Sequence, residues 1–241
     1  MYIIPAIDLL DGKCVRLVQG EYSRYINYED CPEKKAIEFR AAGAEWLHII
    51  DLDGARVGQC VNVDAVRAIL QEAKGLNVQI GGGIRDRDTI AKMLDLGITR
   101  VIVGTKAVND IEWLKEVSRE FAGKVVLSLD ARGNKIATHG WEKESNLELI
   151  DFVKQVAALP LAAIIYTDIN KDGMLAGANV ERTKELAGAV NLPVIAAGGV
   201  TTIEDIQKLA DTKVVAAAIV GRALYEGTMN LPDAIKTCKQ Q

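Results

Sequence analysis

The sequence predicts an α/β fold, a single (β/α)8 TIM barrel in which eight parallel strands alternate with eight helices. Three observations predict it. Short apolar runs alternate with amphipathic stretches along the chain, as in parallel strands covered by helices on both faces. The length of 241 residues suits such a barrel, which commonly has about 250. The pattern also occurs twice, and two copies of four strand-helix units fit a closed barrel better than the alternative, an open doubly wound sheet.

The internal repeat is clearest at the ends of the strands. The run 3–8 ends in an aspartate and returns at 125–130, a separation of 130 − 8 = 122 residues. The pair Gly82-Gly83 returns as Gly198-Gly199, a separation of 198 − 82 = 116 residues. We therefore predict one domain, residues 1–241, with a two-fold half-barrel repeat at about 1–123 and 124–241.

In the first half, the expected strands are 3–8, 46–50, 78–80 and 101–103. Helices are expected from about Pro32 to Gly43, from Val63 to Lys74 with Asn62 as N-cap, and from about Arg87 to Leu96. Residues 12–30 are polar and too many for an ordinary strand-to-helix connection. We expect them to form a loop that closes over the functional site.

In the second half, the expected strands are 125–130, 162–166, 193–196 and 215–220. Helices are expected from about Leu147 to Ala157 with Asn146 as cap, from about Asn179, after Thr201, and from about Leu231. The loop after the fifth strand contains Thr138-His139-Gly140-Trp141. Every expected strand end in a parallel barrel points to the same face, where such folds carry their chemistry.

Composition excludes several classes of function. A formal net charge of −4 and a pI near 5.4 oppose a broad surface for nucleic acid or anionic membrane, so we expect a local site for a small anion. The longest apolar run, 214–220, is too short to span a bilayer, and the N-terminus lacks a signal-like segment, so we expect a cytoplasmic protein. The scattered cysteines predict neither a metal site nor a disulfide: Cys14, Cys31, Cys60 and Cys238.

Glycines between strand and helix predict phosphate sites. Gly82-Gly83 and Gly198-Gly199 would let backbone N–H groups approach an anion beside a helix N-terminus. Gly104-Thr105 and Gly221-Arg222 follow the next strands, so each half would bind one phosphate. A tight turn is the alternative for a single pair, but two pairs in register favour phosphate. Two arginines could pair with a phosphate or a carboxamide: Arg16 and Arg85.

Asp8 and Asp130 would then lie on opposite strands, between the two phosphate sites. Two carboxylates suit proton transfer if burial raises the pKa of one of them, although a lone aspartate at a strand end more often caps a turn, as we expect for Asp11 and Asp53. Trp141 could stack on a planar ring or cover the core. We expect neither histidine to be catalytic: His139 should lie at the surface and His48 in the core.

Several motifs together carry a resemblance: Ile-Pro-Ala-Ile-Asp at 4–8, Gly-Gly-Gly-Ile-Arg at 81–85, Ser-Leu-Asp at 128–130, Gly-Trp at 140–141, Thr-Asp-Ile-Asn-Lys-Asp-Gly at 167–173 and Ile-Val-Gly-Arg-Ala at 219–223. The chain closely resembles, over its whole length, the phosphoribosylformimino-aminoimidazole-carboxamide ribotide isomerases of histidine biosynthesis. The resemblance implies a cofactor-free Amadori rearrangement of a bisphosphorylated aminoaldose, ProFAR, to the aminoketose PRFAR. It implies Asp8 as general base and Asp130 as general acid, with Thr167 and Asp172 lining the substrate.

Gly173 is the last residue of the motif at 167–173, and we expect it to lie beside the substrate as well. We expect a monomer that acts on a small molecule. Three alternatives remain open. The sister cyclase usually has Cys at the position of Ala6, and dual-substrate isomerases that also act on phosphoribosylanthranilate tend to have Arg where this chain has His139. A non-catalytic phosphosugar-binding protein would need the glycines but would have no reason to keep both aspartates.

Overall fold

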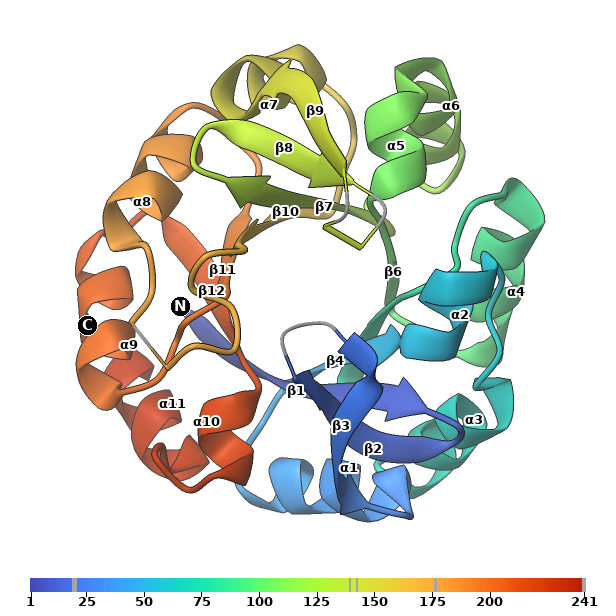
Figure 1. Cartoon of the computed structure of the whole chain (residues 1–241), viewed down its shortest axis with the longest axis vertical. Helices are drawn as coiled ribbons and strands as arrows, with labels where there is room; N and C mark the ends of the chain where they lie inside the picture. Colours follow the sequence, from blue (N-terminus) through green and yellow to red (C-terminus); the bar gives the residue numbers. More distant parts are fainter. Residues whose placement is uncertain (19–20, 139, 142, 176, 240–241) are drawn as a thin grey trace.

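The computed structural model describes residues 1–18, 21–138, 140–141, 143–175 and 177–239. In this part of the chain, eight parallel strands form a closed barrel (Figure 1). They are β1 (Tyr2–Leu10), β4 (Trp46–Asp51), β5 (Asn77–Gly81), β6 (Arg100–Val103), β7 (Val125–Arg132), β10 (Ala163–Asp168), β11 (Val194–Ala197) and β12 (Val215–Val220). The hydrogen-bonded order is β10-β11-β12-β1-β4-β5-β6-β7, and β7 pairs with β10 to close the ring. The predicted (β/α)8 barrel is confirmed, and its two-fold repeat stays a prediction.

Helices surround the barrel (Figure 1). The longer ones are α1 (Pro32–Ala41), α3 (Val63–Glu72), α4 (Arg87–Leu96), α6 (Ile111–Glu120), α7 (Leu149–Val156), α8 (Val180–Gly188), α9 (Ile203–Asp211) and α11 (Leu231–Lys239). Short helices follow three strands: α2 (Leu52–Val57), α5 (Thr105–Asn109) and α10 (Arg222–Tyr225). The bounds predicted for α4 are confirmed, whereas α6 and the short helices were not identified from the sequence. None of the described helices is long and apolar enough to cross a bilayer.

Two segments expected to be loops are β-hairpins. Strands β2 (Lys13–Val18) and β3 (Glu21–Glu29) extend β1, and β8 (Lys135–Thr138) and β9 (Lys143–Glu148) extend β7. Asp11 and Gly12 form the turn that joins β1 to β2. Their φ angles are 50° and 74°, the conformation that Asp-Gly favours in a two-residue hairpin turn. The two hairpins lie on opposite sides of the ring in Figure 1.

The second hairpin corrects one helix start. Residues up to Glu148 pair as β9, so α7 begins at Leu149 with Glu148 as its N-cap. The prediction of Asn146 as cap was wrong, because Asn146 lies within β9. The predicted N-cap position of Asn62 is confirmed for α3, but its side chain makes no capping bond. It donates instead to the carboxylates of Asp51 and Asp53.

Alternate residues of each strand point into the barrel. Apolar side chains form a separate core there: Ile4, Ala6, Ile102, Val126, Ala163, Ile165, Ile195, Ala217 and Ile219. Asp8 is the next inward position of β1 after Ala6, and Asp130 follows Val126 and Ser128 in the same alternation on β7. The apolar core therefore ends where the two carboxylates begin, near the carboxyl ends of the strands.

Candidate active site

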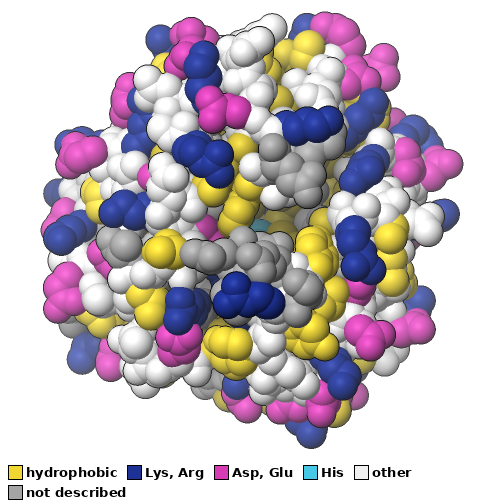
Figure 2. All heavy atoms as spheres, viewed as in Figure 1, with side chains coloured by type: hydrophobic (Ala, Val, Ile, Leu, Met, Phe, Trp, Pro, Cys, Tyr) yellow, Lys and Arg dark blue, Asp and Glu magenta, His cyan; other side chains and the backbone are white. Residues whose placement is uncertain are grey.

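A cavity of about 310 Å³ lies at the carboxyl ends of the barrel strands. Figure 2 shows this face of the molecule hollowed near its centre. The cavity is lined by many of the residues that the sequence singled out: Asp8, Arg16, Asp130, Trp141, Thr167, Asp172, Gly173, Gly198, Gly199, Gly221 and Arg222. Residues from both halves of the chain therefore share one site.

The two carboxylates face this cavity from opposite strands. Going either way round the ring, three strands separate β1 from β7. Arg16, on the first hairpin, lies between Asp8 and a third carboxylate. Its Nη1 is 3.5 Å from Asp8 Oδ2, and its Nη2 is 2.7 Å from Asp172 Oδ2. The β2–β3 hairpin, which follows Asp8 closely in the sequence, thus places the Arg16 cation beside that carboxylate.

Burial raises the pKa of Asp8 from its ordinary value of 3.8 to about 6. The nearby Arg16 guanidinium opposes this shift in the pKa, and the negative charge of Asp172 adds to it. A carboxylate with such a pKa is largely ionised at neutral pH and is a stronger base than an ordinary aspartate. This is the property that a general base requires.

Asp130 has a different neighbour. Trp141 donates its indole N–H to Asp130 Oδ2 over 2.9 Å. Burial raises the pKa of Asp130, whereas the hydrogen bonds from the side chains of Trp141 and Thr167 lower it. Trp141 itself has a φ of 75°, unusual for a residue with a large side chain. The backbone of this loop is therefore held in a costly conformation that directs the indole toward the carboxylate.

The glycines after β11 and β12 lie in the cavity wall. Gly198 and Gly199 have φ of 81° and 79°. A Cβ at Gly198 would be 2.8 Å from the carbonyl oxygen of Asp168, and one at Gly199 would be 2.5 Å from that of Gly177. Only glycine allows this approach of two backbones. The loop leads into α9, whose N-terminus favours anions, so the arrangement is suited to a phosphate.

The corresponding glycines of the first half also follow barrel strands and make similar backbone contacts, but they do not line the cavity. A Cβ at Gly82, where φ is 100°, would be 2.1 Å from the carbonyl oxygen of Asp51. Gly104 and Gly221 have closely similar backbone angles, with φ and ψ of −128° and −102° in one and −107° and −98° in the other. The described residues that line the cavity do not include five of the predicted ones: Gly82, Gly83, Arg85, Gly104 and Thr105.

Arg85 has another role in this structure. It donates from Nη2 to the carbonyl oxygen of Ala55 in α2, over 2.9 Å. A Cβ at Gly58 would be only 2.6 Å from Arg85 Nη1, so the guanidinium packs against the end of that helix. The structure thus brings together the glycines of the second half with both carboxylates. A phosphate site in the first half stays a prediction.

Some residues of the cavity were not identified from the sequence. His48, expected in the core, is only 7% exposed but also lines the cavity, as do Tyr22 and Ser128. The alternation of Trp46, His48 and Ile50 in β4 could have indicated an inward position for the histidine. His139, expected at the surface, lies outside the described residues.

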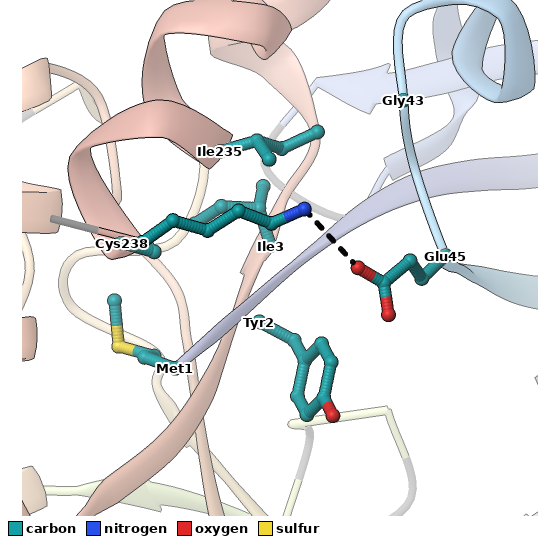
Figure 3. Close-up of a pocket in the computed structure, with 8 residues that line it drawn as sticks. Met1, Tyr2, Ile3, Gly43, Glu45, Ile235 and Cys238 are labelled. Atoms are coloured by element: carbon teal, nitrogen blue, oxygen red, sulfur yellow. Dashed lines mark ion pairs between the residues drawn. The ribbon is translucent and has the colours of Figure 1, made fainter.

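A second cavity, of only about 20 Å³, lies at the start of β1, at the opposite end of the barrel. Figure 3 shows Met1, Tyr2 and Ile3 around it, with an ion pair of 3.5 Å between Lys239 Nζ and Glu45 Oε1. A space of this size holds about one water molecule. It is too small for a sugar phosphate, so the larger cavity is the candidate active site.

Comparisons with known proteins show which family the chain belongs to. A family model described as histidine biosynthesis protein matches residues 2–230. Three relatives are each named 1-(5-phosphoribosyl)-5-((5-phosphoribosylamino)methylideneamino)imidazole-4-carboxamide isomerase. The one from Paracoccus denitrificans is 49% identical over 236 residues, covering 98% of this chain and 99% of its own. The one from Gloeothece citriformis is 46% identical over 242 residues, covering 100% and 94%.

The third, from Cereibacter sphaeroides, is 46% identical over 239 residues and covers 99% of this chain and 100% of its own. The similarity therefore extends over the complete barrel and includes both strands that carry the carboxylates. It agrees with the resemblance noted in the sequence motifs. The chain belongs to the histidine biosynthesis protein family.

Proposed function

We propose that the protein is the histidine-biosynthesis isomerase that converts ProFAR to PRFAR by an Amadori rearrangement. The observation that carries the proposal is that Asp8 and Asp130 line one cavity from opposite strands of the barrel. The names of the relatives support the same reaction. An aldose-ketose rearrangement needs one group that gives a proton and one that takes a proton, and this cavity supplies two carboxylates with raised pKa values.

The proposed mechanism gives each carboxylate one proton transfer. Asp130, as the acid, gives its proton to the ring oxygen while the C1–O bond breaks and the amine nitrogen forms a C=N bond to C1. Asp8, as the base, then removes the proton from C2, the electrons of that C–H bond form a C1=C2 double bond, and the π electrons of the C=N bond return to the nitrogen. The resulting enaminol becomes the ketone when C1 gains a proton and the C2 hydroxyl loses one. Atoms and electrons balance without an external oxidant or cofactor.

The glycines provide the proposed phosphate contacts. Gly198-Gly199 and Gly221-Arg222 would bind one phosphate, and Gly82-Gly83 and Gly104-Thr105 the other. Between them, the middle of the substrate would lie against Thr167, Asp172 and Gly173, with Trp141 stacked on a planar ring. Arg222 supports the loop at Gly173, because its Nη1 donates to the carbonyl oxygen of that residue. We also propose that the enzyme works as a cytoplasmic monomer on a small bisphosphate, with no nucleic-acid partner.

One experiment tests the proposal and separates its alternatives. Purified protein is mixed with ProFAR without ammonia, and PRFAR is measured by chromatography. Formation of PRFAR supports the isomerase. Binding without conversion indicates a phosphosugar-binding protein. In a separate reaction supplied with PRFAR, its consumption only when ammonia is added indicates the sister cyclase. Adding phosphoribosylanthranilate in a parallel reaction shows whether the enzyme has the second activity of the dual-substrate isomerases.

A further inference from the structure

A row of polar side chains lies along one side of the barrel, on three neighbouring strands. Arg100 donates from Nε to Gln79 Oε1 over 2.8 Å. Gln79 Nε2 is in turn 2.8 Å from Nδ1 of His48. At the other end, the guanidinium carbon of Arg100 lies 3.9 Å from the ring centre of Trp46. Three strands, β4, β5 and β6, therefore contribute to one hydrogen-bonded row.

The row connects the inside of the barrel to the active-site cavity. His48 pairs with Gln79 in the register of β4 and β5, and Gln79 pairs with Arg100 in that of β5 and β6. Arg100 is the first residue of its strand, whereas His48 lines the cavity. Gln79 is 0% exposed. Burying polar groups costs free energy unless each is hydrogen-bonded, so this row is held together by its own bonds.

Only one assignment of hydrogen-bond donors and acceptors is consistent along this row. Arginine can only donate, so Gln79 Oε1 must accept from it, and this orients the amide with Nε2 toward His48. The amide nitrogen can also only donate, so Nδ1 of His48 must accept. A ring with its proton on Nδ1 would place two N–H groups against each other. The remaining proton of a neutral His48 is therefore on Nε2.

The electrostatic surroundings also favour a neutral ring. Burial, together with a smaller effect of the positive charge of Arg100, lowers the pKa of His48 from 6.5 to about 3. His48 therefore does not exchange a proton with substrate near neutral pH. It can act there as a donor of fixed direction, which distinguishes it from the two carboxylates.

We propose that Arg100 and Gln79 position His48 as a neutral donor whose Nε2–H binds an oxygen atom of the substrate sugar. This inference rests on the proposed function. In the parallel register Ala6 pairs with His48, so the histidine lies one inward position below Asp8, on the neighbouring strand. A neutral donor there can orient the sugar without forming an ion pair with Asp8, so the base remains available for the proton on carbon. Gln79 and Arg100 act through His48 and are positioning residues.

The first test reads the tautomer directly in the substrate-free protein. The chain has two histidines, so nitrogen-15 NMR of histidine-labelled protein gives two sets of ring signals, and His139→Gln identifies those of His48. The expected result is a neutral ring with its proton on Nε2, unchanged between pH 8 and about pH 5. A proton on Nδ1, or titration near pH 6, would overturn the proposed positioning.

The second test changes the direction of the row. In Gln79→Glu, a carboxylate can accept from Arg100 and from His48, so the ring is expected to carry its proton on Nδ1. Turnover of ProFAR should fall about tenfold or more, as expected for the loss of one directed hydrogen bond. Gln79→Met has a similar volume, no hydrogen-bond donor and only a weak acceptor in its thioether, so its loss of turnover should be smaller than that of Gln79→Glu. A switched tautomer with normal turnover would overturn the role of the Nε2 proton.

The third test applies to His48 itself and does not depend on whether the Gln79 variants fold. His48→Gln places an amide N–H near the position of ring Nε2, whereas His48→Leu offers none. Turnover should be partly retained in the first and lost by about tenfold or more in the second. Equal losses in both would contradict a donor role. If the unaltered protein fails to convert ProFAR, the proposed function is wrong, while the NMR result still decides the positioning.

Discussion

Trp141 donates its indole N–H to a carboxylate oxygen of Asp130 over 2.9 Å, joining the second hairpin to the carboxylate on β7. The tryptophan was expected only to stack on a ring or to cover the core. Because the bond is stronger when the carboxylate is ionised, it lowers the pKa of Asp130 against the larger effect of burial. The position of this hairpin therefore influences how readily the proposed acid gives up its proton.

Trp141→Phe is expected to extend the activity toward higher pH. The variant keeps an aromatic ring but removes the N–H group, so the pKa of Asp130 rises and the acid stays protonated further into the alkaline range. The measurement is the pH profile of kcat. Trp141→Ala is the companion variant. It should show the same shift of the pH profile and, because the aromatic ring is absent, a lower turnover. An alkaline limb that does not move in Trp141→Phe would show that Asp130 does not determine it.

Asp8→Asn and Asp130→Asn are each expected to lower kcat by at least roughly 10²-fold. The amides keep the shape of the side chains but cannot exchange the required protons. Binding of substrate should remain largely intact, since the proposed phosphate contacts are elsewhere. Turnover and calorimetric binding are measured on both. Near-normal turnover in either variant removes that residue from the mechanism.

The acidic limb of the pH profile should report Asp8. Its pKa in the folded protein is about 6, so the base form is lost as the pH falls through 6, and kcat/KM should fall with it. Arg16→Met removes the nearby cation that opposes the rise of the pKa, so the limb should move to higher pH. Profiles of the two proteins are compared at constant ionic strength. A limb that stays in place, or moves to lower pH, contradicts the assignment.

The same shift predicts that Asp8 destabilises the folded protein at neutral pH. Its pKa is raised from 3.8 to about 6 on folding, so the folded state binds the proton more tightly and stability falls as the pH rises between these values. Asp8→Asn should therefore increase the free energy of unfolding at pH 7, by at most about 3 kcal/mol. The gain should vanish below about pH 4. Urea unfolding at the two pH values checks this, and an equal gain at both would contradict it.

Gly82→Ala is expected to destabilise the fold by more than about 3 kcal/mol. The new Cβ would be 2.1 Å from the carbonyl oxygen of Asp51, in a backbone with φ of 100°. Gly75→Ala is the matched control, because Gly75 has a φ of 97° but no atom within 4 Å of the added Cβ. It should cost only the conformational strain, about 1–2 kcal/mol. Equal losses in urea unfolding would show that crowding against Asp51 is unimportant.

Local patterns in the sequence were sufficient to predict the barrel and many residues of the candidate site. The apolar run of β12 and the bounds of α4 are visible because neighbouring residues alone determine such periodicity. Asp8 and Asp130 were found because the end of a parallel strand places its residue at the same face in every unit. The helix α6 could have been found as well, since Asp110 is a recognisable cap whose side chain accepts from the N–H of Trp113.

Contacts between distant segments decided the rest. The pairing of β2 with β3 turned an expected loop into a hairpin that brings Arg16 to Asp172, 156 residues away. Gly82 needs to be glycine because the backbone of Asp51 approaches it, and the sequence around Gly82 contains no sign of that approach. The row from Arg100 to His48 crosses three strands, and only their register reveals it. Local patterns determine which residues form strands and helices, whereas the neighbours of a buried polar side chain depend on how the barrel closes.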